Sequence, residues 1–346
     1  MNTYTRTIQA ALNARRYDLL LGGVEVDLNG PAPRSELRVT SVVRANRAKG
    51  YRFSKYAINA KAKFGSLYAQ GRGEDDCQML AVQKAMSEAC ERVVYRAIRA
   101  TRPEIQNSNG WAAHIDSTKM RDAACFEILE RDAPLVHWYT MTPFLRVSPT
   151  DYPKWLRNWV RYELAHSVFE SLKLFISTEG FIPTVSTVFL DRRGHGVVSH
   201  AHASQLSEAI KRALDETCRM AQLASEKRLH AESISYLNGN SKQNYQPSIH
   251  SLIYAYHLPF PKWISGHEIS WNEANLYWKR RMEKSCFSLP KIEVTEYVTK
   301  PISIGYAKSE GIQNLNFGHP NKTHLCQSRL EIIGNYQYNR QPHFVS

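Results

Sequence analysis

The sequence predicts an α/β protein, and three observations support this fold class. Apolar residues recur at helical spacing in three long segments, at about residues 75–100, 117–138 and 204–226. Strand-like runs precede and separate these helices, at about residues 22–64, 172–177, 184–190 and 196–202. The motif Glu-x-x-Glu-Arg occurs in two of the helical segments, as residues 88–92 and 127–131, which indicates a duplicated unit.

The composition is that of a globular protein with a basic surface. The chain has 346 residues, of which 43% are hydrophobic, so it can bury a large core in one domain or two. Its formal charge of +13 attracts nucleotides, nucleic acid or an acidic peptide, and charge alone does not choose among them. No segment has the apolar length of a secretory signal or a membrane span, so we expect a cytoplasmic protein.

The order of the predicted helices and strands along the chain suggests a short N-terminal segment followed by one continuous region. Residues 4–16 have helical spacing, and residues 22–64 carry strand signals with Gly-Pro turn chemistry between them. We therefore predict an N-terminal α/β lead-in over residues 1–64 and a second, continuous region over residues 65–346. Within that region a polar stretch at 226–250 is interpreted as a loop or lid. Two closing strands are predicted at 292–298 and 302–307.

The first long helix is predicted to begin after Asp75 or Asp76, either of which can cap it. Its apolar stripe leaves Glu88 and Glu91 on the opposite face, with Lys84 beside them. The sequence Gly71-Arg72-Gly73 precedes this helix and is interpreted as a turn.

The second long helix is predicted to begin after Asp116 or Ser117, and an Asn109-Gly110 turn precedes it. Glu127 and Glu130 face away from its apolar side. Each copy of the motif thus presents two carboxylates on one face of a helix.

These carboxylates have two interpretations. A charged helix face is most often solvated, and Glu88 with Arg92 at i, i+4 is a common surface pair. Alternatively, carboxylates from several helices can hold Mg²⁺ while arginines bind phosphates in bidentate fashion. The third helix, which carries Arg212 and Glu216, favours the second interpretation.

Other features are interpreted as structural. The histidines at 195, 200 and 202 are expected to be ordinary strand or loop residues, because no third ligand type lies near them in the sequence. The basic aromatic run from Trp278 to Lys284 is read as a solvated helix face or a surface for a peptide or partner protein. Nucleic acid is the less favoured partner, since the chain lacks a recognisable readout motif.

Five segments together resemble the YcaO family in their order and local spacing. They are residues 71–73, 88–92, 109–113, 123–133 and 209–216. The resemblance implies a YcaO-like fold of layered mixed sheets and helices with internal pseudo-symmetry. It also implies that ATP and Mg²⁺ are bound among the glutamates of these helices.

The resemblance implies an activity on peptides. Family members phosphorylate a backbone amide oxygen after a nucleophile has added to the carbonyl. A neighbouring Cys, Ser or Thr leaves a thiazoline or oxazoline, whereas sulfide, usually with a TfuA partner, leaves a thioamide. We therefore expect an ATP-dependent cyclodehydratase in the maturation of a ribosomally made peptide such as a bacteriocin, with thioamide formation as the alternative.

The resemblance also assigns site residues and partners. It makes metal ligands of Glu88, Glu91, Glu127, Glu130 and Glu216, and ATP contacts of Arg72, Lys84, Arg131 and Arg212. The attacking group belongs to the substrate, so no catalytic residue is assigned, and the C-terminal region with His343 is the candidate general base. The expected partners are the precursor peptide and a separate E1-like (ThiF-like) or TfuA-like leader-binding protein. A flavin dehydrogenase is a candidate third component.

The chain departs from the family pattern at four polar positions. Lys84 stands for a Ser, Ile115 for an Asn, Lys119 for an acidic residue and Arg219 for a Gln. Only about 35 residues separate the two Glu-x-x-Glu-Arg motifs, fewer than the family usually has. These departures motivate a second hypothesis, a degenerate scaffold that binds the peptide or partner without catalysis.

Overall fold

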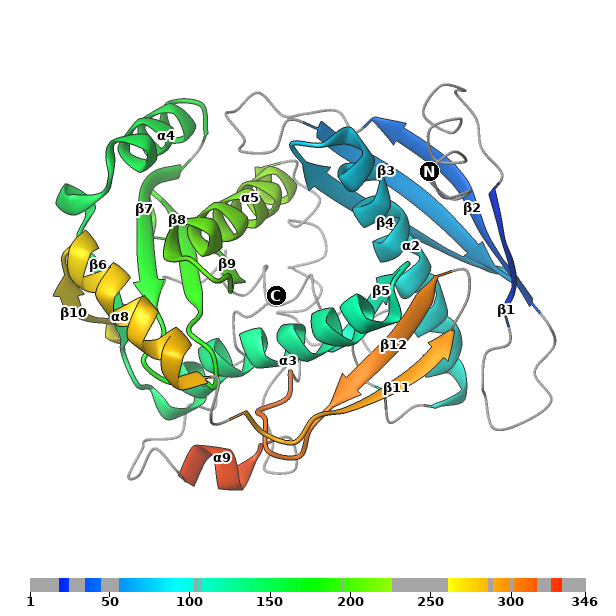
Figure 1. Ribbon diagram of the computed structural model, residues 1–346. Coiled ribbons are helices and arrows are strands. Elements are labelled where there is room, and N and C mark those ends of the chain that lie inside the picture. Colours follow the sequence, from blue (N-terminus) through cyan, green and yellow to red (C-terminus); the bar gives the residue numbers. More distant parts are fainter. Residues whose placement is uncertain are drawn as a thin grey trace. The chain divides into compact units, whose positions relative to one another are not determined.

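The structure is a computed structural model that describes most of the chain (Figure 1). The described residues are 19–24, 35–44, 56–102, 105, 108–167, 169–194, 196–225, 261–285, 289–298, 302–315 and 325–331. The predicted helix at 4–16, the polar stretch at 226–250 and His343 lie outside them. The chain forms a mixed α/β structure with several sheets, which confirms the predicted class.

Two compact units divide the chain. Unit 1 comprises residues 1–47, 52–127 and 292–308, and unit 2 comprises residues 48–51, 128–291 and 309–346. One helix, α3 (Ser117–Thr140), begins in unit 1 and ends in unit 2. The proposed division at residue 64 stays a prediction.

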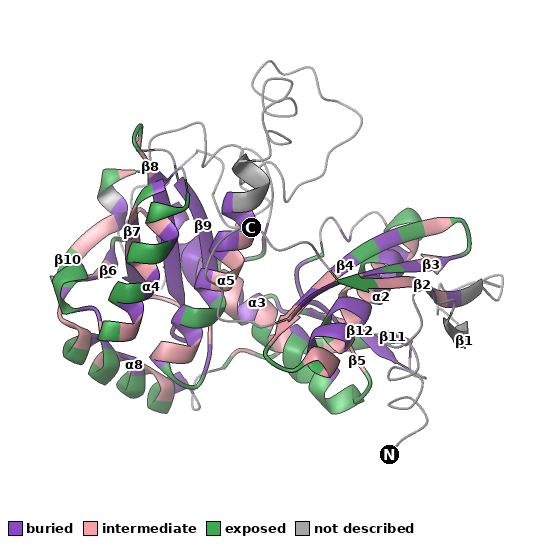
Figure 2. Ribbon diagram, turned by 90° about the horizontal axis from the view of Figure 1, so that it is seen from above, coloured by how far each residue is buried: buried purple, intermediate pink, exposed green. Residues whose placement is uncertain are grey.

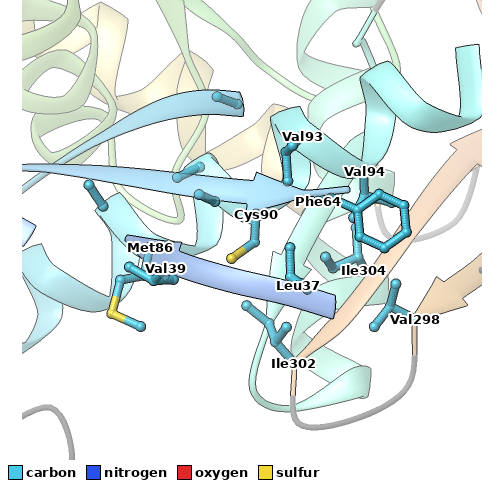
Figure 3. Close-up of a cluster of buried hydrophobic side chains, with 14 of the residues drawn as sticks. Leu37, Val39, Phe64, Met86, Cys90, Val93, Val94, Val298, Ile302 and Ile304 are labelled. Atoms are coloured by element: carbon cyan, nitrogen blue, oxygen red, sulfur yellow. The ribbon is translucent and has the colours of Figure 1, made fainter. Parts of the chain in front are cut away.

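The described residues of unit 1 form two antiparallel sheets and one complete long helix, besides the start of α3. The first sheet has the order β1-β2-β3-β4, with bounds Leu19–Val24, Ser35–Arg44, Tyr56–Phe64 and Leu67–Asp75. The second has the order β11-β12-β5, with bounds Glu293–Val298, Ser303–Lys308 and Trp111–His114. Helix α2 (Gln78–Thr101) packs with both, and one hydrophobic cluster joins Leu37 of β2, Val93 of α2 and Ile304 of β12 (Figure 3).

Gly71 and Gly73 lie in strand β4, so the predicted turn at this position is wrong. A Cβ atom at Gly71 would lie 2.3 Å from the Ala85 carbonyl oxygen, and one at Gly73 would lie 1.9 Å from the Ala81 carbonyl oxygen. Both contacts are with helix backbone, which cannot rotate away. The two glycines therefore allow α2 to lie directly on β4.

Substituting either glycine is expected to separate α2 from the sheet. Gly71→Ala and Gly73→Ala should each lower the free energy of unfolding by about 2 kcal/mol or more, because overpacking against backbone cannot be relieved by a rotamer change. Urea unfolding measures the effect. Gly194→Ala serves as a control for loss of glycine, because a Cβ atom there would have no neighbour within 4 Å. Its φ is +79°, so we expect this variant to lose some stability through backbone strain, but less than Gly71→Ala or Gly73→Ala.

Unit 2 is built on a five-stranded sheet of order β10-β6-β7-β8-β9. Its strands are Ser265–Ile269, Phe144–Val147, Phe169–Ile176, Val185–Asp191 and Gly196–Ala201. Strand β10 runs parallel to β6, and the other pairs are antiparallel. The α-helices that the structure describes in this unit, besides the end of α3, are α4 (Lys154–Ala165), α5 (Leu206–Ser225), α8 (Trp271–Ser285) and α9 (Gln327–Glu331).

The central strands of this sheet are covered on both faces. Val188 of β8 packs in a cluster with Leu135 of α3, while its neighbour Thr187 is bonded by the Thr217 hydroxyl of α5. Successive residues of a strand point to opposite faces, so α3 and α5 cover opposite faces. Every residue of β9 is buried as a result (Figure 2).

The helix starts follow local hydrogen bonding. The Asp116 carboxylate accepts the backbone N–H groups of Thr118 and Lys119, at 2.9 and 3.2 Å, as predicted for the start of α3. At α2 the N-cap is Cys77, so the prediction of Asp75 or Asp76 is wrong; Asp75 instead accepts the Cys77 N–H at 2.9 Å. Among the described residues, no helix has the length and apolar character needed to span a bilayer.

Candidate functional site

Four side chains of α2, spaced four residues apart, bind backbone groups along strand β4. We call them the edge ladder. The pairs are Lys84 Nζ with the Glu74 carbonyl, Glu88 with the Arg72 N–H, Arg92 with the Gln70 carbonyl and Arg96 with the Tyr68 carbonyl. Four residues of a helix rise about 6 Å and two residues of a strand about 6.6 Å. Every fourth side chain of α2 therefore lies level with every second residue of β4. The ladder satisfies outward-facing groups of an edge strand.

Unit 1 contains a first carboxylate group, defined as Glu88, Glu91 and Glu127. Burial raises the pKa of Glu91 well above its usual value, and the negative charges of Glu127 and Glu88 raise it further, while Arg92 opposes them. The Glu88 side chain is 22% exposed and pairs with Arg92 at 2.5 Å. The Glu88–Arg92 pair of the first interpretation is present, whereas Glu91 is not a solvated carboxylate.

Glu91 shows that this group fits a divalent cation. Among the described residues its carboxylate has no hydrogen bond or ion pair, although it is half-buried beside two other acids. Such a carboxylate is stabilised by a cation. In the described ranges, no group of three or more His, Cys, Asp or Glu side chains is arranged to hold a metal ion by itself. Mg²⁺ does not require one, because it keeps several waters and is usually held by one or two carboxylates and substrate phosphates.

Unit 2 contains a second carboxylate group, defined as Glu130 and Glu216. Burial raises the pKa of Glu130, and the charges of Arg131 and Arg212 oppose that rise. The backbone N–H of His202 donates to Glu130 Oε2 at 2.8 Å and fixes one carboxylate oxygen. Glu216 adds a further negative charge near Glu130.

The arginines of unit 2 differ in what they bind. In the described part of the chain, the half-buried Arg131 guanidinium has no hydrogen-bond or ion-pair partner. Arg212 is exposed and pairs with Glu208 at 2.5 Å, and its Nη1 donates to the His202 carbonyl at 3.4 Å. Arg131 is therefore the guanidinium that is available for a phosphate.

Two of the departures from the family pattern bind acidic residues. Arg219 pairs with Glu216 at i, i+3 and so neutralises a member of the second carboxylate group. Lys84 Nζ lies 2.7 Å from Asp75 Oδ2 and also belongs to the edge ladder. The other two, Ile115 and Lys119, have exposed side chains at the start of α3.

The Arg72 backbone lies on β4 beside the first carboxylate group, where its N–H donates to Glu88, whereas its side chain lies on the side of the strand that faces away from α2, with Tyr68 and Gln70. Its Nε donates to Glu74 Oε1 at 2.7 Å, while its Nη2 is buried without a partner. An unpaired buried guanidinium nitrogen can donate to an anionic ligand.

The structure thus gathers the predicted residues into two groups. Glu88, Glu91, Glu127 and Arg72 lie in unit 1, and Glu130, Glu216, Arg131 and Arg212 lie in unit 2. Glu127 and Glu130 are three residues apart on one continuous helix, α3. The sequence did not indicate the His202 N–H as a partner of Glu130, because a backbone donor has no residue-type signature.

Comparison with known proteins identifies the fold. A family model described as YcaO cyclodehydratase, ATP- and Mg²⁺-binding, matches residues 81–277, which contain both carboxylate groups. The sequence finds no match among curated proteins.

Two solved structures share the fold. A YcaO from Methanopyrus kandleri, bound with AMPPCP and Mg²⁺, is 12% identical with a TM-score of 0.52, over 80% of this chain and 86% of that one. A heterocyclase in complex with substrate and cofactor is 13% identical with a TM-score of 0.55, over 88% of this chain and 53% of that one. The expectation of ATP and Mg²⁺ as cofactors is confirmed. The chain belongs to the YcaO family.

Proposed function

We propose that this protein activates backbone amides of a peptide by ATP-dependent phosphorylation. The reaction we assign is cyclodehydration of Cys, Ser or Thr to azolines in a ribosomally made precursor peptide. A substrate side chain adds to the preceding carbonyl, the carbonyl oxygen receives the phosphoryl group, and loss of phosphate leaves the ring. An E1-like or TfuA-like protein presents the peptide, and a flavin dehydrogenase is a candidate third component.

The uncompensated carboxylate of Glu91 is the observation that carries this proposal. Within each unit, the glutamates of its carboxylate group would hold Mg²⁺, which would offset the charge of the ATP phosphates. Arg131 is the donor that we assign to phosphate oxygens. These residues bind and orient, and the nucleophile comes from the substrate.

Mass spectrometry of the precursor peptide tests the reaction. After incubation with the protein, its partner, ATP and Mg²⁺, we expect the loss of one water for each ring formed. A gain corresponding to replacement of oxygen by sulfur, in the presence of sulfide, would assign thioamide formation instead. An unmodified peptide together with undetectable Mg²⁺-dependent ATP binding would contradict both.

The ion pair between Arg219 and Glu216 supports the alternative of a degenerate scaffold. A cation on a metal-binding carboxylate competes directly with the metal ion. Lys84 does not add to this competition, because it binds Asp75 and the backbone of β4. The scaffold hypothesis therefore depends on Arg219.

Replacing Arg219 by the family's glutamine is expected to strengthen Mg²⁺ binding. Arg219→Gln removes the competing cation from Glu216, and we expect the Mg²⁺ concentration for half-maximal nucleotide binding to fall by about threefold to tenfold. Titration of Mg²⁺ against a fluorescent ATP analogue measures it. Arg192→Gln is the control, since Arg192 pairs with Glu170 and is 89% exposed. An unchanged Mg²⁺ requirement in Arg219→Gln would exclude Glu216 as a metal ligand.

A further inference from the structure

One face of the four-stranded sheet in unit 1 carries two lysines, Lys61 and Lys63, that form no ion pair among the described residues. Helix α2 covers the other face, where Leu37, Ala60 and Ala69 are buried. Residues next to these along each strand point away from α2. We call this side the open sheet face, and we define it by Arg38, Lys61, Lys63, Tyr68 and Gln70. Figure 2 shows buried residues alternating with less buried ones along these strands.

The register places cations together on this face. Arg38 of β2 lies directly opposite Lys63 of β3, and Lys61 follows two residues away on the same side. Among the described residues, neither lysine forms an ion pair. Like charges directly opposite each other destabilise a sheet. Arg38 has a further interaction of its own, so Lys61 and Lys63 are the cations of this face that we assign to a ligand.

The neighbours of the lysines add polar and aromatic contacts. Lys63 Nζ lies 5.4 Å from the centroid of the Tyr68 ring, which is 54% exposed, and Gln70 lies opposite Lys61. Thr40 and Ser41 form a bulge opposite Lys61, and the Thr40 hydroxyl donates to the Lys61 carbonyl at 3.4 Å. The bulge fixes the backbone from which Lys61 projects.

The spacing of the two lysines matches that of alternate side chains in an extended peptide. Side chains on one face of a strand repeat at about 6.6 Å, and so do alternate side chains of an extended peptide. Acidic residues at every second position of such a peptide would match Lys61 and Lys63. The edge of β4 is closed by the edge ladder, so the peptide would bind through side chains on the face and not as an added strand.

We propose that the open sheet face binds an acidic, extended segment of the peptide substrate. This rests on the proposed function for the identity of the ligand, and charge complementarity supports it. Single-stranded nucleic acid is bound by series of stacked aromatic rings, whereas Tyr68 is the one aromatic side chain that we place on the described part of this face. A peptide fits the surface better.

Fluorescence anisotropy with labelled synthetic probes tests the proposal on the full chain. The probes are a peptide of alternating Glu and Thr, the same peptide with Gln for Glu, and a single-stranded poly-U RNA of equal length. We expect the Glu peptide to bind and the Gln peptide not to bind. The variant Lys61→Glu/Lys63→Glu should weaken binding of the Glu peptide by about tenfold or more.

A second double variant is matched in charge. Lys279→Glu/Lys284→Glu changes two exposed lysines on α8 and alters the net charge equally. We expect it to bind the Glu peptide within about twofold of the unaltered chain, because screening limits distant charges. An equal loss in both variants would overturn the proposal, and so would tighter binding of the RNA or no binding of the Glu peptide.

Controls distinguish a loss of peptide binding from a loss of folding or of turnover. Lys63→Glu places a carboxylate opposite Arg38, so thermal unfolding of the double variant should occur at or above the temperature of the unaltered chain. If it unfolds earlier, Lys61→Gln/Lys63→Gln removes the charges without reversal and should still weaken binding severalfold. The assay contains no ATP, and Glu91→Gln should bind the peptide normally. Failure here therefore leaves the proposed reaction untouched.

Discussion

Glu91→Gln is expected to abolish peptide-dependent phosphate release and, at the same time, to stabilise the ligand-free chain. The half-buried Glu91 carboxylate lies near Glu88 and Glu127 and has no hydrogen-bond partner among the described residues. Glutamine keeps the shape and removes the charge, so the ligand-free chain should gain about 1 kcal/mol. The loss of a metal ligand should lower kcat by about 100-fold or more. Urea unfolding and a phosphate-release assay measure the two effects.

Glu88→Gln is the matched comparison. Glu88 belongs to the same carboxylate group, yet it accepts the Arg72 N–H and pairs with Arg92 in the edge ladder. Its replacement should therefore lower turnover and also lower stability, opposite in sign to the effect at Glu91. Glu127→Gln and Glu130→Gln should lose turnover as well. Turnover that survives in both of these would show that the metal site is wrongly assigned.

Glu91 should also set a pH dependence of stability. Because its pKa is raised in the folded chain, the folded state binds a proton more tightly than the unfolded state does. Stability from this group is present below the unfolded pKa, which is about 4.3, and is lost as the pH rises toward the folded pKa. Thermal unfolding of the ligand-free chain across this range should show the decline, and Glu91→Gln should show less of it.

The sequence predicted α2, α3 and α5 because their signals are local, whereas α4 and α9 were not predicted. Apolar spacing and the Asp116 cap located α3, and the Glu-x-x-Glu-Arg motifs located the carboxylates. Strand β4 was not predicted, since Gly71, Arg72 and Gly73 have the composition of a turn. Those glycines reflect the close approach of α2, which depends on tertiary packing and has no signal in a short window of sequence.

The electrostatics of the site depended on the fold more than on residue types. Lys84 and Arg219 are both cations at altered positions, yet one binds Asp75 and the other binds Glu216. Residue type predicts a charge, whereas its effect on a metal ion depends on which acid it reaches. Sequence spacing placed Glu216 near both Arg212 and Arg219, and only the structure shows which one pairs with it.

Arg329→Met is expected to be the most destabilising substitution in unit 2. The Arg329 guanidinium makes contacts of 2.9 to 3.2 Å with both oxygens of Asp132, and the two side chains are 6% and 0% exposed. Burial raises the pKa of Asp132 and Arg329 opposes that rise, so removal of the arginine leaves an uncompensated buried carboxylate. We expect a loss of about 3 to 5 kcal/mol in the free energy of unfolding, measured with urea.

The double variant Asp132→Asn/Arg329→Met separates the charge from the packing. It removes both charges. The asparagine keeps an acceptor for the Gln313 N–H, which in the unaltered chain donates to Asp132 Oδ1 at 2.9 Å. The methionine keeps an unbranched side chain over the Phe181 ring, whose centroid lies 4.6 Å from the Arg329 guanidinium carbon. Most of the lost stability should therefore return. A double variant as unstable as Arg329→Met would show that packing, and not the buried charge, dominates. Because Asp132 directly follows Glu130 and Arg131 on α3, recovery of stability without turnover would show that the ion pair also orients these two residues.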